Sequence, residues 1–164
     1  MTATFDSQLA SHMTRVHRAS LGFMGNAEEA REVAQDALAK ALAARDRYDV
    51  SRPFYPWLYR IVKNTCLDAL ARRRHRAAPG LESERVVAAT ATQDVILTRA
   101  RDRVRIARAM DRLAEEQREI LNLRHFQDLS YAEIAALLGV PEGTVMSRIY
   151  RARRALVRKL EEEA

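Results

Sequence analysis

The sequence has little cysteine, glycine and proline, and each scarcity excludes a class of structure. Its 164 residues include one cysteine, which excludes a disulfide framework and any zinc site built from several thiolates. Five glycines and four prolines leave few helix breakers against 28 alanines, the strongest helix formers. No segment alternates apolar and polar residues with a period of two, as a half-buried strand would. These observations predict an all-α protein.

Membrane and export signals are also absent from the sequence. No segment approaches the roughly 18 consecutive apolar residues of a membrane-spanning helix. The N-terminus does not show the basic and then apolar order of a signal peptide. We therefore expect a cytoplasmic protein with no membrane insertion.

Residue groupings typical of enzymes are equally scarce. The four histidines have no carboxylate or thiol partners at the spacing of metal ligands. Gly22 and Gly25 are not preceded by the strand that a nucleotide-binding loop requires. Cys66 stands in a helical, apolar neighbourhood, where a small buried side chain is a simpler interpretation than a nucleophile. The sequence therefore predicts no catalytic residue, no metal and no cofactor.

The positive charge is carried almost entirely by arginine. The net charge is +6, and 25 of the 28 basic residues are arginine. The planar guanidinium suits phosphate groups and guanine edges, so the composition favours a nucleic-acid partner. A GC-rich genome, which encodes arginine in place of lysine, would produce the same composition. Both interpretations remain open on composition alone.

The charge is divided among three segments, which indicates two domains. The net charge is +5 over residues 1–80, −2 over 81–97 and +3 over 98–164. A Pro-Gly pair at the end of the first segment terminates helical structure. We therefore predict two small helical domains, at 1–76 and 97–164, joined by a flexible linker over 77–96.

A capped helix is predicted in the first domain. Asn26 and Glu29 have the spacing of a capping box. The apolar residues that follow recur with the period of a helix, at Ala30, Val33, Ala34, Ala37, Leu38, Ala41 and Leu42. The opposite face carries Glu32, Gln35 and Asp36. This face is interpreted either as a solvated surface or as an acidic surface that docks a partner.

Another helix is predicted over 54–76, after a loop that is rich in aromatic residues. The segment Tyr48–Trp57 holds four of the ten aromatic residues and two prolines. On the helix, Arg60, Lys63 and Arg74 lie opposite the apolar side, and an arginine run begins at Arg72. Aromatic rings beside a basic helix suit single-stranded nucleic acid, because bases stack on rings and cations follow phosphates. The alternative is an aromatic core with a solvated helix end.

The second domain contains the pattern of a helix-turn-helix. Helices are predicted over 102–114 and 115–125, with Ile106, Met110 and Leu113 on one apolar face. Ser130 and Glu133 form a capping box for a third helix, which ends at Gly139. Ala135, Gly139 and Val145 then have the spacing of a helix-turn-helix.

The last helix is suited to the major groove of DNA. Its predicted buried face consists of Val145, Ile149, Ala152 and Leu156. The candidate DNA-contacting residues lie on its outer face and at the margins of that face: Gly143, Thr144, Ser147, Arg148, Tyr150, Arg151 and Arg154. In such a motif the N-terminal residues read base edges and the arginines hold phosphates. A plain helical hairpin is the alternative interpretation.

Two segments carry a resemblance to a known family. They are Phe54-Tyr-Pro-Trp-Leu-Tyr-Arg-Ile-Val-Lys-Asn64 and Leu129-Ser-Tyr-Ala-Glu-Ile-Ala135, the latter followed by Gly139-Val-Pro-Glu-Gly-Thr-Val145. The motifs Val33–Leu38 and Leu113–Ile120 support it. Together they resemble the extracytoplasmic-function sigma factors of bacterial RNA polymerase, a sigma-70 group with regions 2 and 4 only. The resemblance covers nearly the whole chain.

The resemblance implies a transcription subunit rather than an enzyme. Such proteins bind core RNA polymerase, direct it to promoters and help to open the duplex. Region 2, residues 1–76, would dock the polymerase through Glu32, Gln35 and Asp36. It would engage the minus-ten element, as duplex and as single-stranded non-template strand, through Tyr55, Trp57, Arg60, Lys63, Asn64, Arg72, Arg73 and Arg74. Region 4, residues 97–164, would read the minus-thirty-five element through its helix-turn-helix. The family also implies an anti-sigma factor as an inhibiting partner.

Met146 departs from the family pattern, which often has a basic residue at this position. Methionine can contact a thymine methyl group but cannot make the bidentate contact of arginine with guanine, which is worth about 1–3 kcal/mol. We therefore predict little polar readout from Met146 and more from Ser147, Arg148 and Arg151. Ala37 and Leu38 also stand where many relatives have larger residues, which would alter core packing only.

Two other functions remain open from the sequence. A stand-alone helix-turn-helix repressor or activator would use the second domain alone for DNA, but it has no need of an aromatic loop beside a basic helix. A helical interaction module that binds an anti-sigma protein would keep the docking faces. That module would bind promoter DNA poorly even with polymerase present.

Overall fold

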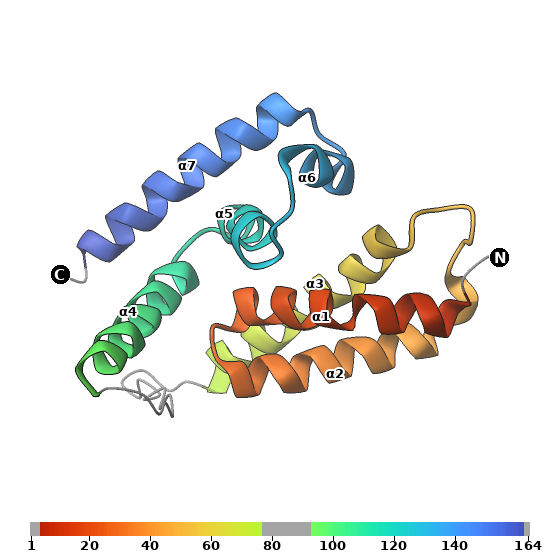
Figure 1. Ribbon diagram of the computed structural model, residues 1–164, viewed down its shortest axis with the longest axis horizontal. Coiled ribbons are helices and arrows are strands. Elements are labelled where there is room, and N and C mark those ends of the chain that lie inside the picture. The colour runs from red at the N-terminus through yellow and green to blue at the C-terminus, as the bar shows by residue number, and fades with distance from the viewer. Residues whose placement is uncertain (1–3, 77–92, 163–164) are drawn as a thin grey trace. The chain divides into compact units, whose positions relative to one another are not determined.

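The computed structural model describes residues 4–76 and 93–162, and every regular element in these ranges is a helix (Figure 1). The predicted all-α class is confirmed. The chain divides into two compact units, Met1–Pro79 and Gly80–Ala164. Most of the linker predicted over 77–96 lies outside the described residues, and its last residues belong to a helix that begins at Gln93. None of the described helices combines the length and hydropathy needed to span a bilayer.

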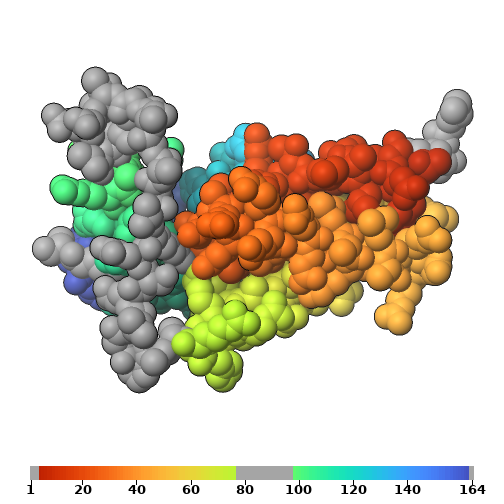
Figure 2. Space-filling view, turned by 90° about the horizontal axis from the view of Figure 1, so that it is seen from below, coloured from red at the N-terminus to blue at the C-terminus, as the bar shows by residue number. Residues whose placement is uncertain are grey.

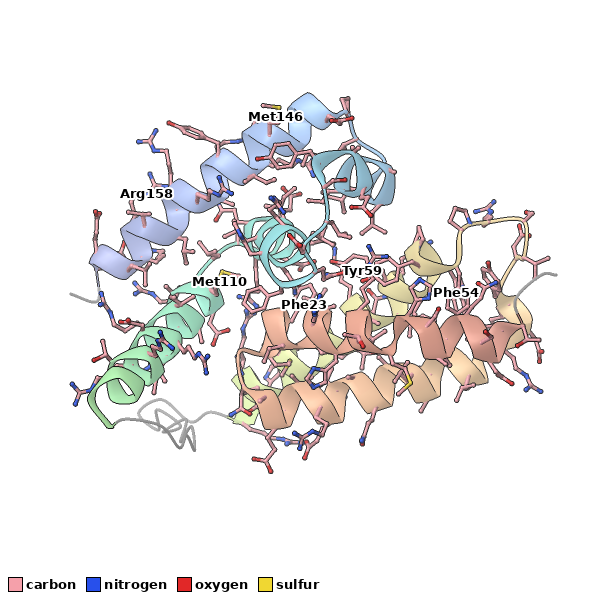
Figure 3. All side chains as sticks on the ribbon, viewed as in Figure 1. Phe23, Phe54, Tyr59, Met110, Met146 and Arg158 are labelled. Atoms are coloured by element: carbon pink, nitrogen blue, oxygen red, sulfur yellow. The ribbon has the colours of Figure 1, made fainter. Side chains whose placement is uncertain are left out.

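The N-terminal unit consists of three long helices that pack on one another. They are α1 (Phe5–Met24), α2 (Ala27–Ala43) and α3 (Phe54–Arg76), with a short 3-10 helix, η1 (Arg45–Arg47), after α2. Its core includes Val16, Phe23, Leu58 and Val62, each at most 1% exposed, and Figure 3 labels Phe23. Gly25 takes a left-handed conformation, with φ of 67°, which allows the tight corner between α1 and α2.

The caps of the first helices are partly as predicted. Asn26 accepts hydrogen bonds from the backbone N–H groups of Glu28 and Glu29, at 2.8 and 3.2 Å, and so begins α2. The capping box itself is wrong, because the carboxylate of Glu29 pairs with Arg73 of α3. The bounds predicted for α3 are confirmed. The apolar face of α2 is confirmed for its alanines and valine. Leu38 is half-buried and Leu42 is 45% exposed, because both lie at the edge of that face.

The C-terminal unit is built around α7. Its elements are α4 (Gln93–Asp111), α5 (Glu115–Leu121), the single wide turn of π-helix η2 (Asn122–Phe126), α6 (Tyr131–Leu138) and α7 (Glu142–Glu161). Helices α4, α5 and α6 each contact α7. The first helix of this unit was predicted over 102–114, but α4 begins at Gln93 and ends at Asp111. The second was predicted over 115–125 and is helical over that range, although only α5 is α-helical and its continuation η2 is a π-helix. Ile106, predicted on the apolar face, is 42% exposed, whereas Met110 and Leu113 are buried.

A buried arginine joins α4 to α5. Arg118 is 3% exposed, and its guanidinium donates hydrogen bonds to the carbonyl oxygens of Met110 at 3.0 Å and Asp111 at 2.7 Å. The last carbonyl groups of a helix have no partner within that helix. Arg118 supplies that partner at the end of α4, where Figure 3 labels Met110, and it thereby fixes α5 against α4.

The predicted helix-turn-helix is confirmed as a fold. The Ser130 hydroxyl accepts from the Glu133 N–H at 3.2 Å, and the Glu133 carboxylate accepts from the Ser130 N–H at 2.8 Å, so the capping box is complete. Gly139 ends α6 with φ of 66°. Val145 of α7 is fully buried, and Leu156, predicted to be buried, is half-buried beside the buried Ala155. The motif thus holds α7 with one side free.

Candidate nucleic-acid and docking surfaces

The free side of α7 presents most of the residues predicted to contact the minus-thirty-five element. Gly143, Ser147, Tyr150, Arg151 and Arg154 are exposed, whereas Thr144 and Arg148 are half-buried at its margin. We name these seven residues the α7 surface. The Ser147 hydroxyl donates to the Thr144 carbonyl at 3.0 Å, and Arg151 Nε donates to the Ser147 carbonyl at 3.3 Å. These bonds hold the hydroxyl and the guanidinium along the helix.

Met146 borders the α7 surface. It is 56% exposed and lies on the outer side of the helix in Figure 3. Its position therefore permits contact with a base, as the sequence predicts, although it offers no hydrogen-bond donor. At Gly143 an added Cβ would meet nothing within 4 Å, so the backbone at the start of α7 is open to a close approach.

Arg153 points to another side of α7 and belongs to the unit's own structure. Its guanidinium lies 3.5 Å from Nε2 of His125 in η2. Burial, together with the charges of Arg153 and Arg124, lowers the pKa of His125. The neutral ring is therefore favoured, because a proton there would be repelled by both neighbouring guanidinium groups.

The aromatic loop of the N-terminal unit forms a packed cluster with the first helix. The rings of Phe5, Tyr48, Phe54 and Trp57 lie with centroids 5.1 to 6.2 Å apart. Thr4 caps α1 by accepting from the Ser7 N–H at 3.3 Å, which places Phe5 in the first turn. Trp57 keeps part of its surface exposed, so its ring can still stack on a base.

The loop before α3 is held by its own hydrogen bonds. The Tyr48 hydroxyl donates to the Arg52 carbonyl at 2.7 Å. The Asp49 carboxylate accepts from the Ser51 N–H at 3.0 Å and hydroxyl at 2.7 Å, and these bonds lower the pKa of Asp49. Val50, at the tip, is 84% exposed. A loop ordered in this way presents an apolar side chain to a partner at a small further cost in entropy.

Tyr55, unlike Trp57 and Val50, is buried. Its position does not support the prediction that it contacts DNA. It is 8% exposed, beneath the Arg15 guanidinium at 4.2 Å and stacked on His12 at 5.3 Å. Burial raises the pKa of Tyr55. Tyr55 is the second residue of α3 and its ring faces His12 and Arg15 of α1, so it belongs to the core of this unit.

The basic residues of α3 lie on two different sides of the helix. With about 100° of rotation per residue, Arg74 is on the side of Arg60 and Lys63, and Asn64 borders them. Arg60, Asn64 and Arg74 are exposed, and Lys63 is half-buried. Arg72 and Arg73 turn instead toward α2, and Arg73 donates to the Glu29 carboxylate at 3.1 Å. The minus-ten set predicted from the sequence is thus divided by the fold.

The residues predicted to dock the polymerase are exposed on α2. Glu32, Gln35 and Asp36 all reach solvent, and Asp36 forms an ion pair with Lys40 at 3.1 Å. Lys40 Nζ also lies 3.5 Å from the hydroxyl of Thr65 on α3, so the side of α2 that bears Asp36 faces α3. In Figure 2, α2 in orange and the end of α3 in yellow-green lie side by side.

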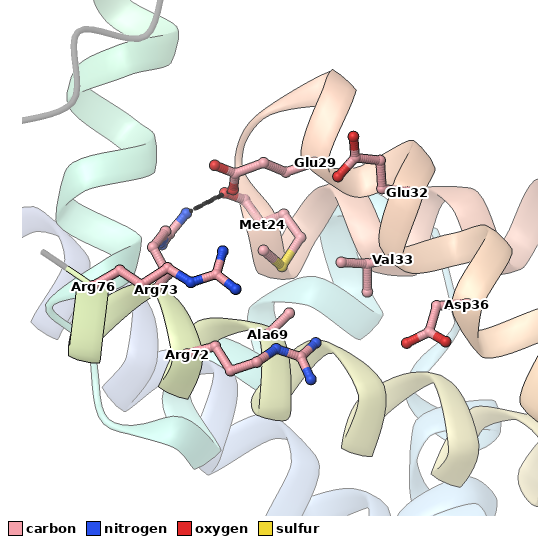
Figure 4. A pocket seen from close by; sticks show the side chains of 9 residues that line it. All are labelled: Met24, Glu29, Glu32, Val33, Asp36, Ala69, Arg72, Arg73 and Arg76. Carbon is pink, nitrogen blue, oxygen red and sulfur yellow. Dashed lines mark hydrogen bonds and ion pairs between the residues drawn. The ribbon is translucent and has the colours of Figure 1, made fainter.

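Between these two helices is a groove that sequence reasoning missed. It has a volume of about 530 Å³ and is drawn in Figure 4. Its walls carry acidic and basic side chains, and its floor is apolar. The lining residues are Met24, Glu29, Glu32, Val33, Asp36, Ala69, Arg72, Arg73 and Arg76. We name it the α2–α3 groove. The helical period alone places Arg72 and Arg74 on different sides of α3. That Arg72 lies opposite the acidic residues of α2 depends on how α3 packs on α2, which the sequence does not show.

The remaining candidate, Cys66, has no reactive setting. It is fully buried, with Sγ 3.9 Å from the Ser20 hydroxyl, and burial raises the pKa of its thiol to about 12. A thiol with such a pKa is not a nucleophile at neutral pH. Within the described ranges, histidine, cysteine and acidic side chains form no group of three or more that could hold a metal ion.

Comparison with known proteins identifies the two units. The family model "Sigma-70 region 2" matches residues 9–76, and "Sigma-70, region 4" matches residues 103–156. The RNA polymerase sigma-H factor of Pseudomonas aeruginosa is 31% identical over 96% of this chain and 86% of its own length. The ECF RNA polymerase sigma-E factor of Escherichia coli is 34% identical over 79% of this chain and 73% of its own length.

A solved structure agrees with these relatives. The structure of CnrH in complex with the cytosolic domain of CnrY matches with a TM-score of 0.64 and 27% identity, over 98% of this chain and 89% of CnrH. Both regions therefore occur in one chain, in the order of that family and over most of its length. The chain belongs to the sigma-70 family of RNA polymerase sigma factors, in its extracytoplasmic-function group.

Proposed function

We propose that this chain binds core RNA polymerase and directs it to specific promoters as an alternative sigma factor. The observation that carries the proposal is the presence, in one chain, of region 2 with an aromatic loop beside a basic helix and region 4 with a free helix-turn-helix surface. A protein that reads only duplex DNA needs the second feature alone. A protein that opens DNA needs both.

In this proposal the α7 surface reads the minus-thirty-five element. Gly143, Thr144 and Ser147 lie in the first two turns of α7, where base edges are reached, and Arg148, Arg151 and Arg154 follow toward the phosphates. The support is the exposure of Gly143, Ser147, Arg151 and Arg154 on the side of α7 away from Val145 and Ile149, with Thr144 and Arg148 at its margin. Each lost phosphate contact would lower the slope of log affinity against log salt concentration by about 1.

The minus-ten element would lie along α3 and the loop before it. Trp57 would stack on an unpaired base, while Arg60, Lys63, Asn64 and Arg74 would follow the strand on the outer side of α3. Extruding a base costs a few kcal/mol, and the ordered loop from Tyr48 to Pro53 reduces the further entropy cost of binding it. Tyr55, Arg72 and Arg73 are omitted from this set because they face α1 or α2.

The remaining assignments follow from the same proposal. Residues 1–76 act as region 2 with Glu32, Gln35 and Asp36 in the polymerase contact, and residues 97–164 act as region 4. The linker over 77–96 connects them, with α4 beginning inside it. The protein acts in the cytoplasm, where the polymerase is. CnrH was solved with a domain of a second protein, CnrY, which supports an anti-sigma partner for this chain as well.

Transcription with purified components tests the proposal. Core RNA polymerase is incubated with a pool of genomic fragments, with and without the full chain, and run-off products are compared. We expect promoter-specific products only when the chain is present. If the chain binds duplex DNA on its own and adds no product on any template, it is a stand-alone regulator and the proposal is wrong.

A pair of variants on α7 tests the assignment of region 4. Arg151→Ala removes a residue of the α7 surface, whereas Arg153→Ala removes an exposed arginine that faces His125. We expect the first to weaken holoenzyme binding to minus-thirty-five DNA and the second to leave it within about twofold. Equal losses for both variants would mean that general positive charge, not this surface, carries the binding.

A further inference from the structure

The α2–α3 groove has the charge pattern of a protein-binding surface rather than of a DNA-binding one. Glu29, Glu32 and Asp36 line the α2 side, and Arg72, Arg73 and Arg76 line the α3 side (Figure 4). The three carboxylates and three guanidinium groups cancel in net charge. A nucleic-acid strand laid in the groove would bring its phosphates beside carboxylates, so a polyanion is a poor occupant.

One end of the groove is closed by an ion pair. Arg73 bridges from α3 to the Glu29 carboxylate at 3.1 Å and to the Met24 carbonyl at 3.3 Å. These contacts hold the corner between α1 and α2 against the end of α3. They fix the spacing of the two walls, so that Glu32 and Arg72 face the open groove from opposite helices.

Three further charged residues of the groove, Glu32, Arg72 and Arg76, are exposed and can reach a partner, whereas Asp36 is exposed but pairs with Lys40. Met24, Val33 and Ala69 provide an apolar floor between the walls. A helix that enters such a groove buries apolar side chains on the floor. It would place basic side chains toward α2 and acidic side chains toward α3. The groove is therefore complementary to an amphipathic helix that carries both signs of charge on separate sides.

We propose that Arg72 and Arg76 form the second wall of the polymerase-docking surface, opposite Glu32 and Asp36, and that the occupant is a helix of core RNA polymerase with acidic side chains toward α3. The inference rests on the proposed function, because it names further residues for the polymerase contact. Arg72, which was predicted from the arginine run to contact DNA, is here assigned to the polymerase contact instead. Arg74, only two residues later, stays with the DNA-binding side.

Two charge-matched double variants of the full chain test this assignment. Arg72→Glu with Arg76→Glu reverses the α3 wall of the groove, and Arg60→Glu with Arg74→Glu makes the same change in net charge on the outer side of α3. All four arginines are exposed, so both variants should fold, and thermal melting checks that they do. Affinity for purified core polymerase is measured first. Binding of a minus-ten non-template oligonucleotide is then measured at saturating holoenzyme.

The two variants should fail in different assays. The groove variant should lose at least tenfold in affinity for core polymerase and keep oligonucleotide binding within twofold of wild type. The outer-side variant should show the reverse. If the groove variant keeps its core affinity within twofold, or loses oligonucleotide binding as the outer-side variant does, the assignment is overturned while the proposed function stands. If the wild-type chain does not bind core polymerase, both are overturned.

A charge swap separates docking from a merely structural role. Glu32→Arg with Arg72→Glu keeps one charge of each sign in the groove but exchanges the walls. If the walls only stabilise the fold, the swap should restore core affinity to within twofold of wild type, which would overturn the proposal. If the walls receive a polymerase helix, the exchanged charges repel its side chains, and the tenfold loss should remain.

Discussion

Replacing Arg118 is expected to destabilise the C-terminal unit strongly, although this residue lies on none of the proposed binding surfaces. Its guanidinium is buried and donates to the carbonyls of Met110 and Asp111, which end α4. Arg118→Met keeps an unbranched side chain of comparable length and removes the donors. Both carbonyls would then lose a charged donor at the junction of α4 and α5, although the Met110 carbonyl keeps its bond from the Leu113 N–H at 3.1 Å.

The size of the loss follows from these two bonds. A hydrogen bond from a charged donor contributes about 1.5–3 kcal/mol, so two of them contribute about 3–6 kcal/mol. The variant no longer has to bury a guanidinium, which offsets part of the loss. We therefore expect a decrease of about 3 kcal/mol in the free energy of unfolding. For a domain of 60–100 residues, this corresponds to a fall in Tm of about 12–24 °C.

The single tryptophan makes the assay specific to one unit. Trp57 lies in the N-terminal unit, so its fluorescence follows that unit, whereas circular dichroism at helical wavelengths follows both. Arg118→Met should add an early transition to the dichroism melt that the tryptophan signal does not show. Arg112→Met is the control, since Arg112 is exposed and its ion pair with Glu162 lies at the surface, where such a pair is worth about 1 kcal/mol or less. Equal, small losses of stability for both variants would mean that the buried hydrogen bonds of Arg118 do not stabilise the C-terminal unit.

Three further predictions concern α6, α7 and η2. Gly139→Ala should destabilise the C-terminal unit by about 1–2 kcal/mol in denaturant unfolding, because φ is +66° although nothing lies within 4 Å of an added Cβ. Gly143→Ala, with equal space and no positive φ, should instead stabilise α7 by about 0.5–1 kcal/mol, and a loss at both positions would contradict this. Met146→Arg should increase the preference for guanine at one upstream position in a binding-site selection, and unchanged preference and affinity would show that this position does not face a base. The pKa of His125 is lowered in the folded state, so acidification protonates the unfolded chain first, and stability should fall as pH drops below about 6.5. His125→Gln should remove that part of the pH dependence of the denaturation midpoint, and an identical pH profile would count against it.

The local signals of the sequence were sufficient for most helices. Asn26 and Ser130 cap the helices that they were predicted to cap, and Gly139 takes the left-handed conformation that a tight turn requires. These features depend on residues within four positions of one another. The wide turn η2 and the positive φ of 54° at Asp128 were missed, because neither Asn122–Phe126 nor an aspartate after it carries a distinctive local pattern.

The surfaces were harder to predict because they depend on how helices pack. The aromatic segment was found from its composition, but only the packing of α3 on α1 shows that Tyr55 is buried. Arg72, Arg73 and Arg74 form one run in sequence, yet two of them face α2 and the third does not. The partners of Glu29 and Arg118 lie on other helices, so no spacing rule within one segment could have found them.

Sequencing the 5′ ends of transcripts that core polymerase makes on genomic DNA, with and without the full chain, shows directly whether the chain selects promoters. If it is a sigma factor, the start sites should share a minus-ten and a minus-thirty-five element, and these starts should be lost when the chain is omitted. Start sites with no shared elements, or the same start sites without the chain, would contradict its role as a sigma factor.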